Sequence, residues 1–196
     1  VYDRGLTDKP EVTVETLAGV KKLQLHRSDG KVTSVTVDMG EPELMPEKIP
    51  VRADTDRFVD QEITANGQDY RLTAVSMGNP HGVVFVEDTD CLDLPSIGPG
   101  FENHPLFPER TNTEFVQILS RDRMKMRVWE RGAGETLACG TGACAAVAAA
   151  VENGLCPADT DISVQVPGGT LYVRYESGRV SLRGKVARVY DADIEY

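Results

Sequence analysis

The sequence predicts an α+β fold, in which a mostly antiparallel sheet curls as a barrel around one central helix. Two observations lead to this prediction. Short runs of alternating polar and apolar residues recur along the chain, with turn signals roughly every 8–12 residues. Only Ala143 to Glu152 reads as a clear helix, which ends at Asn153-Gly154. Because strands outnumber helices, hairpins are favoured over strand–helix–strand units with a parallel sheet.

The predicted strands share this alternation or a high content of β-branched residues. They are Glu11–Leu17, Val32–Val37, Tyr70–Ser76, Gly82–Val86, Thr113–Leu119, Met124–Trp129, Ile162–Val166, Leu171–Tyr175 and Val180–Gly184. Ser28-Asp29-Gly30 is a predicted turn. The segment from Glu41 to Arg52 carries three prolines and is expected to be irregular. Leu94 to Pro108, rich in Pro and Gly, is expected to be a loop with a short helix.

Composition excludes several classes of function. The chain has 196 residues and a formal net charge of −10, with its basic residues scattered, which argues against nucleic-acid binding. The longest nearly apolar run, Ala143 to Val151, is too short to span a bilayer. No leader-like segment opens the sequence, so we expect a cytoplasmic protein. The first residues, Val1 to Gly5, resemble the last turn of a helix, and we expect the natural N-terminus to lie upstream.

The cysteine pattern favours free thiols. Cys91, Cys139, Cys144 and Cys156 form no C-x-x-C pair, and the three histidines are far apart in the sequence. This spacing does not suggest a zinc site. In a reducing compartment four free thiols are favoured over two disulfides.

The segment with the strongest chemical signal runs from Trp129 to Ala146. Four glycines fall between Gly132 and Gly142, and a helix of almost pure alanine follows. Cys139 is placed directly before the first turn of that helix, where backbone N–H groups lack partners and the dipole is positive. We therefore expect a stabilised thiolate, with a pKa of roughly 3.5–7.5. The N–H groups of Gly140, Thr141 and Gly142 offer a cradle for a carboxylate beside it.

A base next to a bound α-carboxylate suits removal of an α-proton from an amino acid, since the amides stabilise the developing enolate. The alternative is a tight turn followed by a small buried cysteine with no chemical role. A phosphate-binding loop is disfavoured because no lysine follows Gly142, and the dinucleotide pattern lacks its third glycine. A hydrolytic cysteine would need an activating histidine, for which His81 and His104 are candidates by type.

Two further stretches are candidates for a site. Met77 to Gly82 places an Asn-Pro turn between two strands, which would project Asn79 and His81 into a cleft; the alternative is a plain turn with a capping asparagine. Pro108 to Glu114 precedes another strand, and the alternative there is a solvated polar loop.

Taken together, these stretches resemble the diaminopimelate epimerase family. The resemblance spans the whole chain and rests on motifs in the family's order. They are Gly78-Asn79-Pro80-His81, Glu109-Arg110-Thr111-Asn112, Glu130-Arg131-Gly132, Glu135-Thr136, and Ala138-Cys139-Gly140-Thr141-Gly142-Ala143-Cys144, with Gly5-Leu6-Thr7, Met39-Gly40-Glu41-Pro42 and Pro167-Gly168-Gly169 in support.

The resemblance implies a cofactor-independent enzyme that interconverts LL- and meso-2,6-diaminopimelate, for lysine and peptidoglycan precursors. It implies no PLP and no metal, a small-molecule substrate, and a homodimer in the full-length protein. Cys139 matches one of two acid/base residues on opposite faces of the α-carbon, and Glu130 and His81 match residues important for catalysis. Glu130 also meets the amino group at the reacting end of the substrate. The remaining matches concern binding: Asn79, Asn112 and Arg131 at the distal end of the substrate, and Gly140 and Thr141 at the carboxylate.

One departure from the family pattern matters. The family carries its second catalytic cysteine in an N-terminal segment, ahead of the Gly-Leu-Thr region, that this sequence does not contain. The resemblance therefore implies that residues 1–39 and 184–196 belong to one domain and that 40–183 form a second. We expect this chain alone to be inactive. The alternatives are a non-catalytic folded fragment that only binds ligand or dimerises, or a related racemase or isomerase with another substrate.

Overall fold

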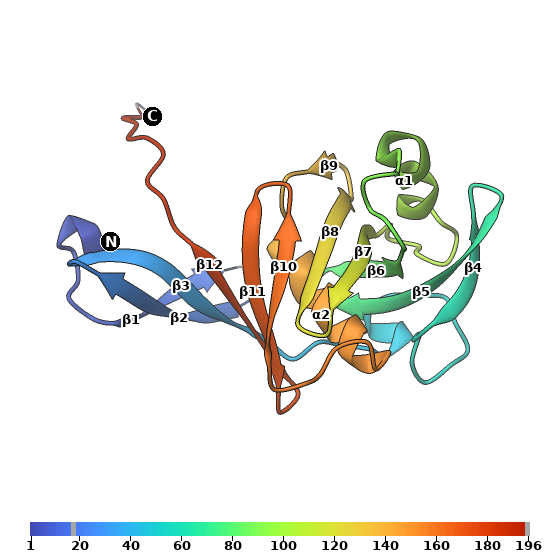
Figure 1. Cartoon of the computed structure of the whole chain (residues 1–196), viewed down its shortest axis with the longest axis horizontal. Coiled ribbons are helices and arrows are strands. Elements are labelled where there is room, and N and C mark those ends of the chain that lie inside the picture. Colours follow the sequence, from blue (N-terminus) through green and yellow to red (C-terminus); the bar gives the residue numbers. More distant parts are fainter. Residues whose placement is uncertain (17–18, 195–196) are drawn as a thin grey trace.

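A computed structural model describes residues 1–16 and 19–194 of the chain, and its strands form one continuous sheet (Figure 1). The strand bounds are β1 Glu11–Thr16, β2 Gly19–Ser28, β3 Lys31–Gly40, β4 Gln61–Ala65, β5 Gln68–Ser76, β6 Pro80–Phe85, β7 Asn112–Ser120, β8 Arg123–Glu130, β9 Gly134–Thr136, β10 Asp161–Val166, β11 Gly169–Glu176 and β12 Arg179–Lys185. The helices are α1 Leu94–Glu102 and α2 Gly140–Glu152, with short 3₁₀ turns at Tyr2–Arg4 and Pro46–Lys48. None of the helices that the structure describes is long and apolar enough to cross a membrane.

The sheet is mostly antiparallel, as predicted, but it is open and does not close into a barrel. The strand order is β1-β2-β3-β12-β11-β10-β8-β7-β6-β5-β4, with β9 attached to β8. Among the strands of the described residues, two neighbouring pairs are parallel, β6 with β7 and β8 with β10, and the others are antiparallel. The edge strands β1 and β4 are not paired with each other, so the predicted closed barrel is wrong. Alternation predicts which face a residue occupies, but it cannot show whether the two ends of a sheet meet.

Helix α2 supplies the centre of the main core, as the alanine-rich sequence predicts. Every residue from Gly142 to Ala150 is buried. Methyl side chains let the strands approach the helix closely, and larger apolar residues from the sheet fill the space around it. These include Val75, Val83, Val116, Met126, Ile162 and Val173.

The same central strands cover a second core on their opposite face. Ala74, Val84 and Phe115 point away from α2 and pack with Leu94 and Phe101 of α1. Successive residues of a strand point to opposite faces, so adjacent residues in β5, β6 and β7 serve different cores. This alternation also decides which polar side chains face the start of α2.

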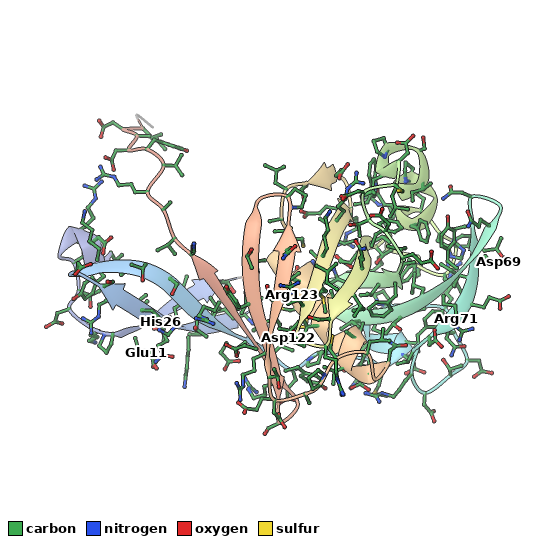
Figure 2. All side chains as sticks on the ribbon, viewed as in Figure 1. Glu11, His26, Asp69, Arg71, Asp122 and Arg123 are labelled. Atoms are coloured by element: carbon green, nitrogen blue, oxygen red, sulfur yellow. The ribbon has the colours of Figure 1, made fainter. Side chains whose placement is uncertain are left out.

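Strands β1 to β3 form an extension that has no buried residue of its own. They join the rest of the sheet through β12, which pairs with β3 on one side and β11 on the other. Figure 2 shows the side chains spread widely around these strands, where Glu11 and His26 are labelled, and crowded around β5 to β8. The buried hydrophobic residues all lie between Leu44 and Val180.

Candidate active site

Cys139 is the N-cap of helix α2, at the position that the sequence predicts. Its backbone is extended (φ −128°, ψ 114°), and its sulfur accepts a hydrogen bond from the N–H of Gly142 at 3.3 Å. The hydroxyl of Thr141 lies 3.5 Å from the same sulfur. Cys139 is only 7% exposed. The sulfur therefore caps the helix directly and occupies the Gly142 amide, which the sequence had suggested as part of a carboxylate cradle.

The environment of Cys139 favours the neutral thiol, so the expected stabilised thiolate is wrong. Burial raises the pKa of Cys139 to about 11, and the carboxylates of Glu114 and Glu130 act in the same direction. The hydrogen bonds from Thr141 and Gly142 lower the pKa, but by less. The helix N-terminus was the only influence visible in the sequence. Burial and nearby acidic groups depend on tertiary structure, and here they outweigh it.

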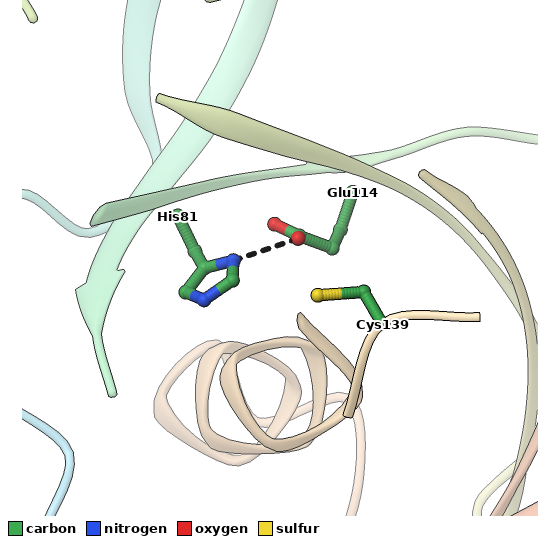
Figure 3. Close-up of side chains that lie close together, drawn as sticks. All are labelled: His81, Glu114 and Cys139. Atoms are coloured by element: carbon green, nitrogen blue, oxygen red, sulfur yellow. Dashed lines mark hydrogen bonds and ion pairs between the residues drawn. The ribbon is translucent and has the colours of Figure 1, made fainter. Parts of the chain in front are cut away.

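The strands deliver His81 and Glu114 to the start of α2. His81 lies two residues before Val83 in β6, and Glu114 lies two residues before Val116 in β7. Val83 and Val116 both pack against α2, so the period of two puts the polar pair on the same face. Figure 3 shows the sulfur of Cys139 pointing toward this pair.

His81 and Glu114 form a buried pair. Both side chains are 0% exposed, and Nδ1 of His81 lies at hydrogen-bond distance, 2.7 Å, from Oε1 of Glu114. The other carboxylate oxygen, Oε2, has no hydrogen-bond partner among the described residues. Glu114 lies within the Pro108–Glu114 stretch, but the sequence does not single it out as a site residue. A glutamate near the start of a strand is usually exposed to solvent.

Asn79 links His81 to the first turn of α2. Its Oδ1 lies 3.1 Å from Nε2 of His81, and its Nδ2 donates to the Thr141 hydroxyl at 3.3 Å. The proximity of Asn79, His81 and Cys139 could not be read from sequence, since the cysteine is separated from the other two by more than fifty positions. The structure brings all three together.

Asn112 is buried, and both ends of its amide are occupied by protein groups. Its Nδ2 donates to the carbonyl of Pro80 at 3.1 Å, and its Oδ1 accepts from the backbone N–H of Arg131 at 2.8 Å. Asn112 thus ties the Asn79–His81 turn to the loop that follows β8. One N–H of Nδ2 and one lone pair of Oδ1 are thus engaged by the protein.

Glu130 and Arg131 occupy the end of β8 and the turn after it. The hydroxyl of Thr136 in β9 donates to Oε1 of Glu130, and the charge of Glu130 reaches Cys139. Arg131 donates from Nη1 to the carbonyl of Glu109 at 2.9 Å. The charge of Glu130 therefore acts on the thiol, whereas the Arg131 guanidinium is anchored to the loop before β7.

A second buried carboxylate, Glu102 at the end of α1, supports this turn. It accepts hydrogen bonds from Nε1 of Trp129 at 2.8 Å, from the N–H of Gly132 at 2.9 Å and from Nη1 of Arg110 at 2.9 Å. Neither Glu102 nor Thr136 was a candidate from sequence. Each is recognisable only once α1 and β9 are placed against β8.

The amides of Gly140 and Thr141 are the free donors at the helix N-terminus. They come before the first intrahelical hydrogen bond, which runs from the N–H of Ala143 to the carbonyl of Cys139. No hydrogen bond is recorded for either amide within residues 1–16 and 19–194. These two donors lie next to the sulfur and can accept an anionic group there.

The site also contains the one group of metal-ligating side chains among the described residues. His81, Glu114 and Cys139 offer ligand atoms that all lie within 4.8 Å of one another. Nδ1 of His81 and Oε1 of Glu114 already contact each other at 2.7 Å. A separate cavity of about 680 Å³, lined by residues including Tyr2, Leu25, Val35 and Val186, contains none of the predicted site residues.

The other cysteines do not meet Cys139 at this site. All four are free; Cys91 is exposed, and Cys144 and Cys156 are buried. Cys144 belongs to the apolar core around α2. One thiol alone is therefore placed beside the free amides and the acidic side chains.

Comparison with known proteins gives a consistent result. The family model described as diaminopimelate epimerase matches residues 73–189. The diaminopimelate epimerase of Desulfovibrio desulfuricans is 52% identical over 98% of this chain and 69% of its own length. That of Acetivibrio thermocellus is 47% identical over 100% of this chain and 70% of its own length.

Solved structures share the fold at low sequence identity. A hydroxyproline epimerase from Agrobacterium vitis superposes with a TM-score of 0.67 at 17% identity, over 94% of this chain and 60% of that one. A probable proline racemase from Agrobacterium radiobacter gives 0.69 at 15% identity, over 94% and 61%. The chain thus spans about 60% of these two structures, and the likeness concerns the fold alone. The sequence match over nearly the whole chain shows that it belongs to the diaminopimelate epimerase family.

Proposed function

We propose that this chain provides the Cys139 face of a cofactor-independent, two-base site that interconverts LL- and meso-2,6-diaminopimelate. The observation that carries the proposal is a sulfur at the N-cap of α2, beside two unpaired amides and within reach of the Glu130 charge. Membership of the family supports the choice of substrate. The product would serve the synthesis of lysine and of peptidoglycan precursors.

The amides of Gly140 and Thr141 would bind the α-carboxylate of the substrate. They point outward from the first turn of α2, where the helix dipole favours an anion. As the α-proton leaves, negative charge spreads from the α-carbon into the carboxylate. Donors that already point at those oxygens stabilise this charge without reorganising.

Cys139 would act as the acid in one direction and as the base in the other. With its pKa raised to about 11, the resting group is the neutral thiol and carries the proton to be delivered. A base on the opposite face removes the α-proton as the C–H bond breaks. The S–H proton then forms the new C–H bond, leaving a thiolate that is the base for the reverse reaction.

The remaining side chains would orient the substrate. Glu130, held by Thr136, would pair with the amino group at the reacting end. Arg131 and Asn79 would meet the distal end, where a guanidinium suits a carboxylate because it can bind through two parallel hydrogen bonds. For Asn112 we propose an indirect contribution, since its amide fixes the backbone of Arg131 at 2.8 Å.

We further propose a division into two domains, with residues 40–183 as one and residues 1–39 and 184–196 as parts of the other. Two observations support it: the buried hydrophobic residues run from Leu44 to Val180, and β1 to β3 contain no buried residue. A cytoplasmic homodimer is the expected form of the full natural protein.

Exchange of the substrate α-proton with heavy water tests the role of Cys139. In the full natural protein, Cys139→Ala should lower epimerisation by about 10²–10⁴-fold, the usual contribution of a positioned acid or base. Cys91→Ser is the matched control, because Cys91 is exposed and lies outside the site; it should leave the rate unchanged. Unaltered exchange in Cys139→Ala would refute the proposal.

Calorimetry with meso-diaminopimelate separates binding from turnover. If the unsubstituted full natural protein binds this ligand but catalyses no exchange, the site has a binding function only. Turnover of proline in preference to diaminopimelate would instead indicate a related racemase.

A further inference from the structure

The buried pair of His81 and Glu114 raises a question that the proposed function leaves open: what the carboxylate does. Glu114 is 0% exposed, and the ring of His81 is its one hydrogen-bonding partner among the described residues. A buried carboxylate is costly unless it is paired with a strong donor. Because burying Glu114 is costly and its partner His81 lies next to the thiol of Cys139, we expect the carboxylate to have a function at this site.

The geometry around the imidazole is asymmetric. Nδ1 faces the carboxylate of Glu114 at 2.7 Å, and Nε2 lies 3.1 Å from Oδ1 of Asn79, in an amide that can also present its Nδ2 there when it is turned over. An ionised carboxylate only accepts hydrogen bonds, so a proton must sit on Nδ1. Neutral imidazole in water favours the other tautomer, with its proton on Nε2. Glu114 therefore reverses the ordinary preference of the ring.

The effect of this choice extends to the first turn of α2. The amide of Asn79 lies between Nε2 of His81 and the hydroxyl of Thr141, and that hydroxyl lies 3.5 Å from the sulfur of Cys139. A chain of polar contacts thus runs from Glu114 through His81, Asn79 and Thr141 to the thiol. With the proton on Nδ1, Nε2 is an acceptor, so the Asn79 amide turns over: its Nδ2 donates to Nε2, and its Oδ1 accepts from the Thr141 hydroxyl.

Glu114 also shapes the helix start directly. A Cβ on Gly142 would lie 2.5 Å from Oε1 of Glu114 and 3.2 Å from Cβ of Cys139. Glycine at this position leaves room for the carboxylate to reach His81 under the first turn. The titratable groups that face His81 are Glu114 from β7 and Cys139 from the start of α2, and Glu130 at the end of β8 acts on Cys139.

We propose that Glu114 is a positioning residue that holds the Nδ1 proton of His81 and thereby presents Nε2 to Asn79 and the Thr141–Cys139 turn. Its kinetic consequence rests on the proposed function. Its structural consequence, the tautomer of His81, does not.

Nitrogen NMR of His81, with the ring labelled with ¹⁵N, tests the tautomer without any assay of activity. At pH 8 the unsubstituted protein should show Nδ1 in the protonated range. In Glu114→Gln, Nδ1 should shift toward the unprotonated range, because an amide has no charge to hold the proton. Glu102→Gln is the matched control: it neutralises another buried glutamate that does not touch His81, and it should leave the Nδ1 signal in place.

Two results would overturn the proposal: an unprotonated Nδ1 in the unsubstituted protein, or a Glu114→Gln spectrum that still shows Nδ1 protonated. If Glu114→Gln fails to fold, the unsubstituted spectrum and that of Glu114→Asp, which keeps the charge and should keep the Nδ1 proton, decide the question.

The kinetic arm links the pair to the reaction. Supporting partners that orient a reactive group typically contribute about 10–100-fold, so Glu114→Gln should lower kcat by that factor and change KM much less. Inactivity of the unsubstituted full natural protein, with the predicted tautomer present, would refute the proposed function and leave the positioning of His81 intact. If Nδ1 is protonated in the unsubstituted protein but kcat is unchanged in Glu114→Gln, the pair does not contribute to catalysis.

Discussion

The thiol of Cys139 is subject to opposing influences that act over a few ångströms. The N-terminus of α2 and the hydroxyl of Thr141 favour its anion, whereas burial and two carboxylates favour its proton. Burial and the two carboxylates have the larger effect, and the pKa of Cys139 lies at about 11. A proton-loaded thiol suits a residue that donates to a carbanion. It also makes the resting enzyme less sensitive to electrophiles than a thiolate would be.

Labelling of Cys139 with iodoacetamide should follow that raised pKa. Between pH 7 and 10 its rate should rise about tenfold per pH unit without a plateau, because only the thiolate reacts. Mass spectrometry of the peptide that contains Cys139 measures the rate. The urea-unfolded chain is the control. Its labelling rate should level off once the pH exceeds the ordinary cysteine pKa of 9.0. A plateau below pH 8 in the folded protein would restore the stabilised thiolate that the sequence suggests.

The same shift makes stability depend on pH. Folding keeps Cys139 protonated at a pH where the unfolded chain would ionise. Its contribution is therefore complete below about pH 9 and is lost as pH rises toward 11.

The His81–Glu114 pair should behave as a coupled unit in urea denaturation. His81→Ala leaves Glu114 buried without its donor and should lower the free energy of unfolding by about 3–5 kcal/mol. The double variant His81→Ala with Glu114→Ala removes the stranded charge as well, so it should lose less than the sum of the two single variants. Strict additivity would show that the two side chains do not interact in solution.

At the scale of elements, the first turn of α2 needs glycine for a steric reason at one position only. A methyl group at Gly142 would meet the Glu114 carboxylate at 2.5 Å, whereas at Gly140 it would meet the flexible end of Leu182 at 3.2 Å. Gly142→Ala should therefore destabilise the protein by about 1–3 kcal/mol, a typical cost of overpacking. Gly140→Ala, the matched control, should stay within about 1 kcal/mol of the unsubstituted protein. Thermal unfolding of both variants makes the comparison, and equal losses would contradict it.

The turn after β8 is held by a carboxylate whose charge is used structurally. Burial opposes the ionisation of Glu102, but donors from Trp129, Gly132 and Arg110 more than compensate, and its pKa lies below the ordinary value of 4.5. Because the pKa of Glu102 is lower in the folded than in the unfolded chain, its ionised carboxylate stabilises the fold at any pH above the pKa of the unfolded chain. That contribution is lost as the pH falls through the pKa of the folded chain.

Glu102→Gln should consequently be less stable than the unsubstituted protein at pH 7, and the difference should narrow as pH falls below about 4.5. Urea denaturation at several pH values measures the narrowing. Glu109→Gln, at an exposed position in the neighbouring loop, should show no such trend. A constant difference for Glu102→Gln from pH 7 to pH 3 would mean that the charge has no structural use.

At the scale of the whole molecule, stability should be uneven along the sheet. The strands that pack against α2 are buried on at least one face, whereas β1 to β3 carry no buried residue. Hydrogen exchange followed by mass spectrometry should therefore show residues 19–40 exchanging well before residues 113–130 and 162–174. Equal protection of the two regions would contradict this picture.

The sequence determined most of the local structure, because local structure depends on neighbours in the chain. The alternation of residues 113–119 and 124–129 predicts the β7–β8 hairpin, and the alanines after Gly142 predict α2 and its burial. The N-cap position of Cys139 also follows from sequence, since the glycines and the onset of the helix adjoin it. The strands β2, β4 and β9 were not predicted; β9 has three residues, too few for a recognisable period.

Only the tertiary structure decided the chemistry of the site. His81, Glu114, Asn79 and Cys139 meet because β6 and β7 pair in parallel and both face α2, and no spacing in the sequence encodes that pairing. The direction of the Cys139 pKa shift, the occupied amide of Asn112 and the open edges of the sheet were likewise beyond the sequence. Each depends on burial, on charges or on strand partners that lie far apart in the chain, and these arise only when the chain packs.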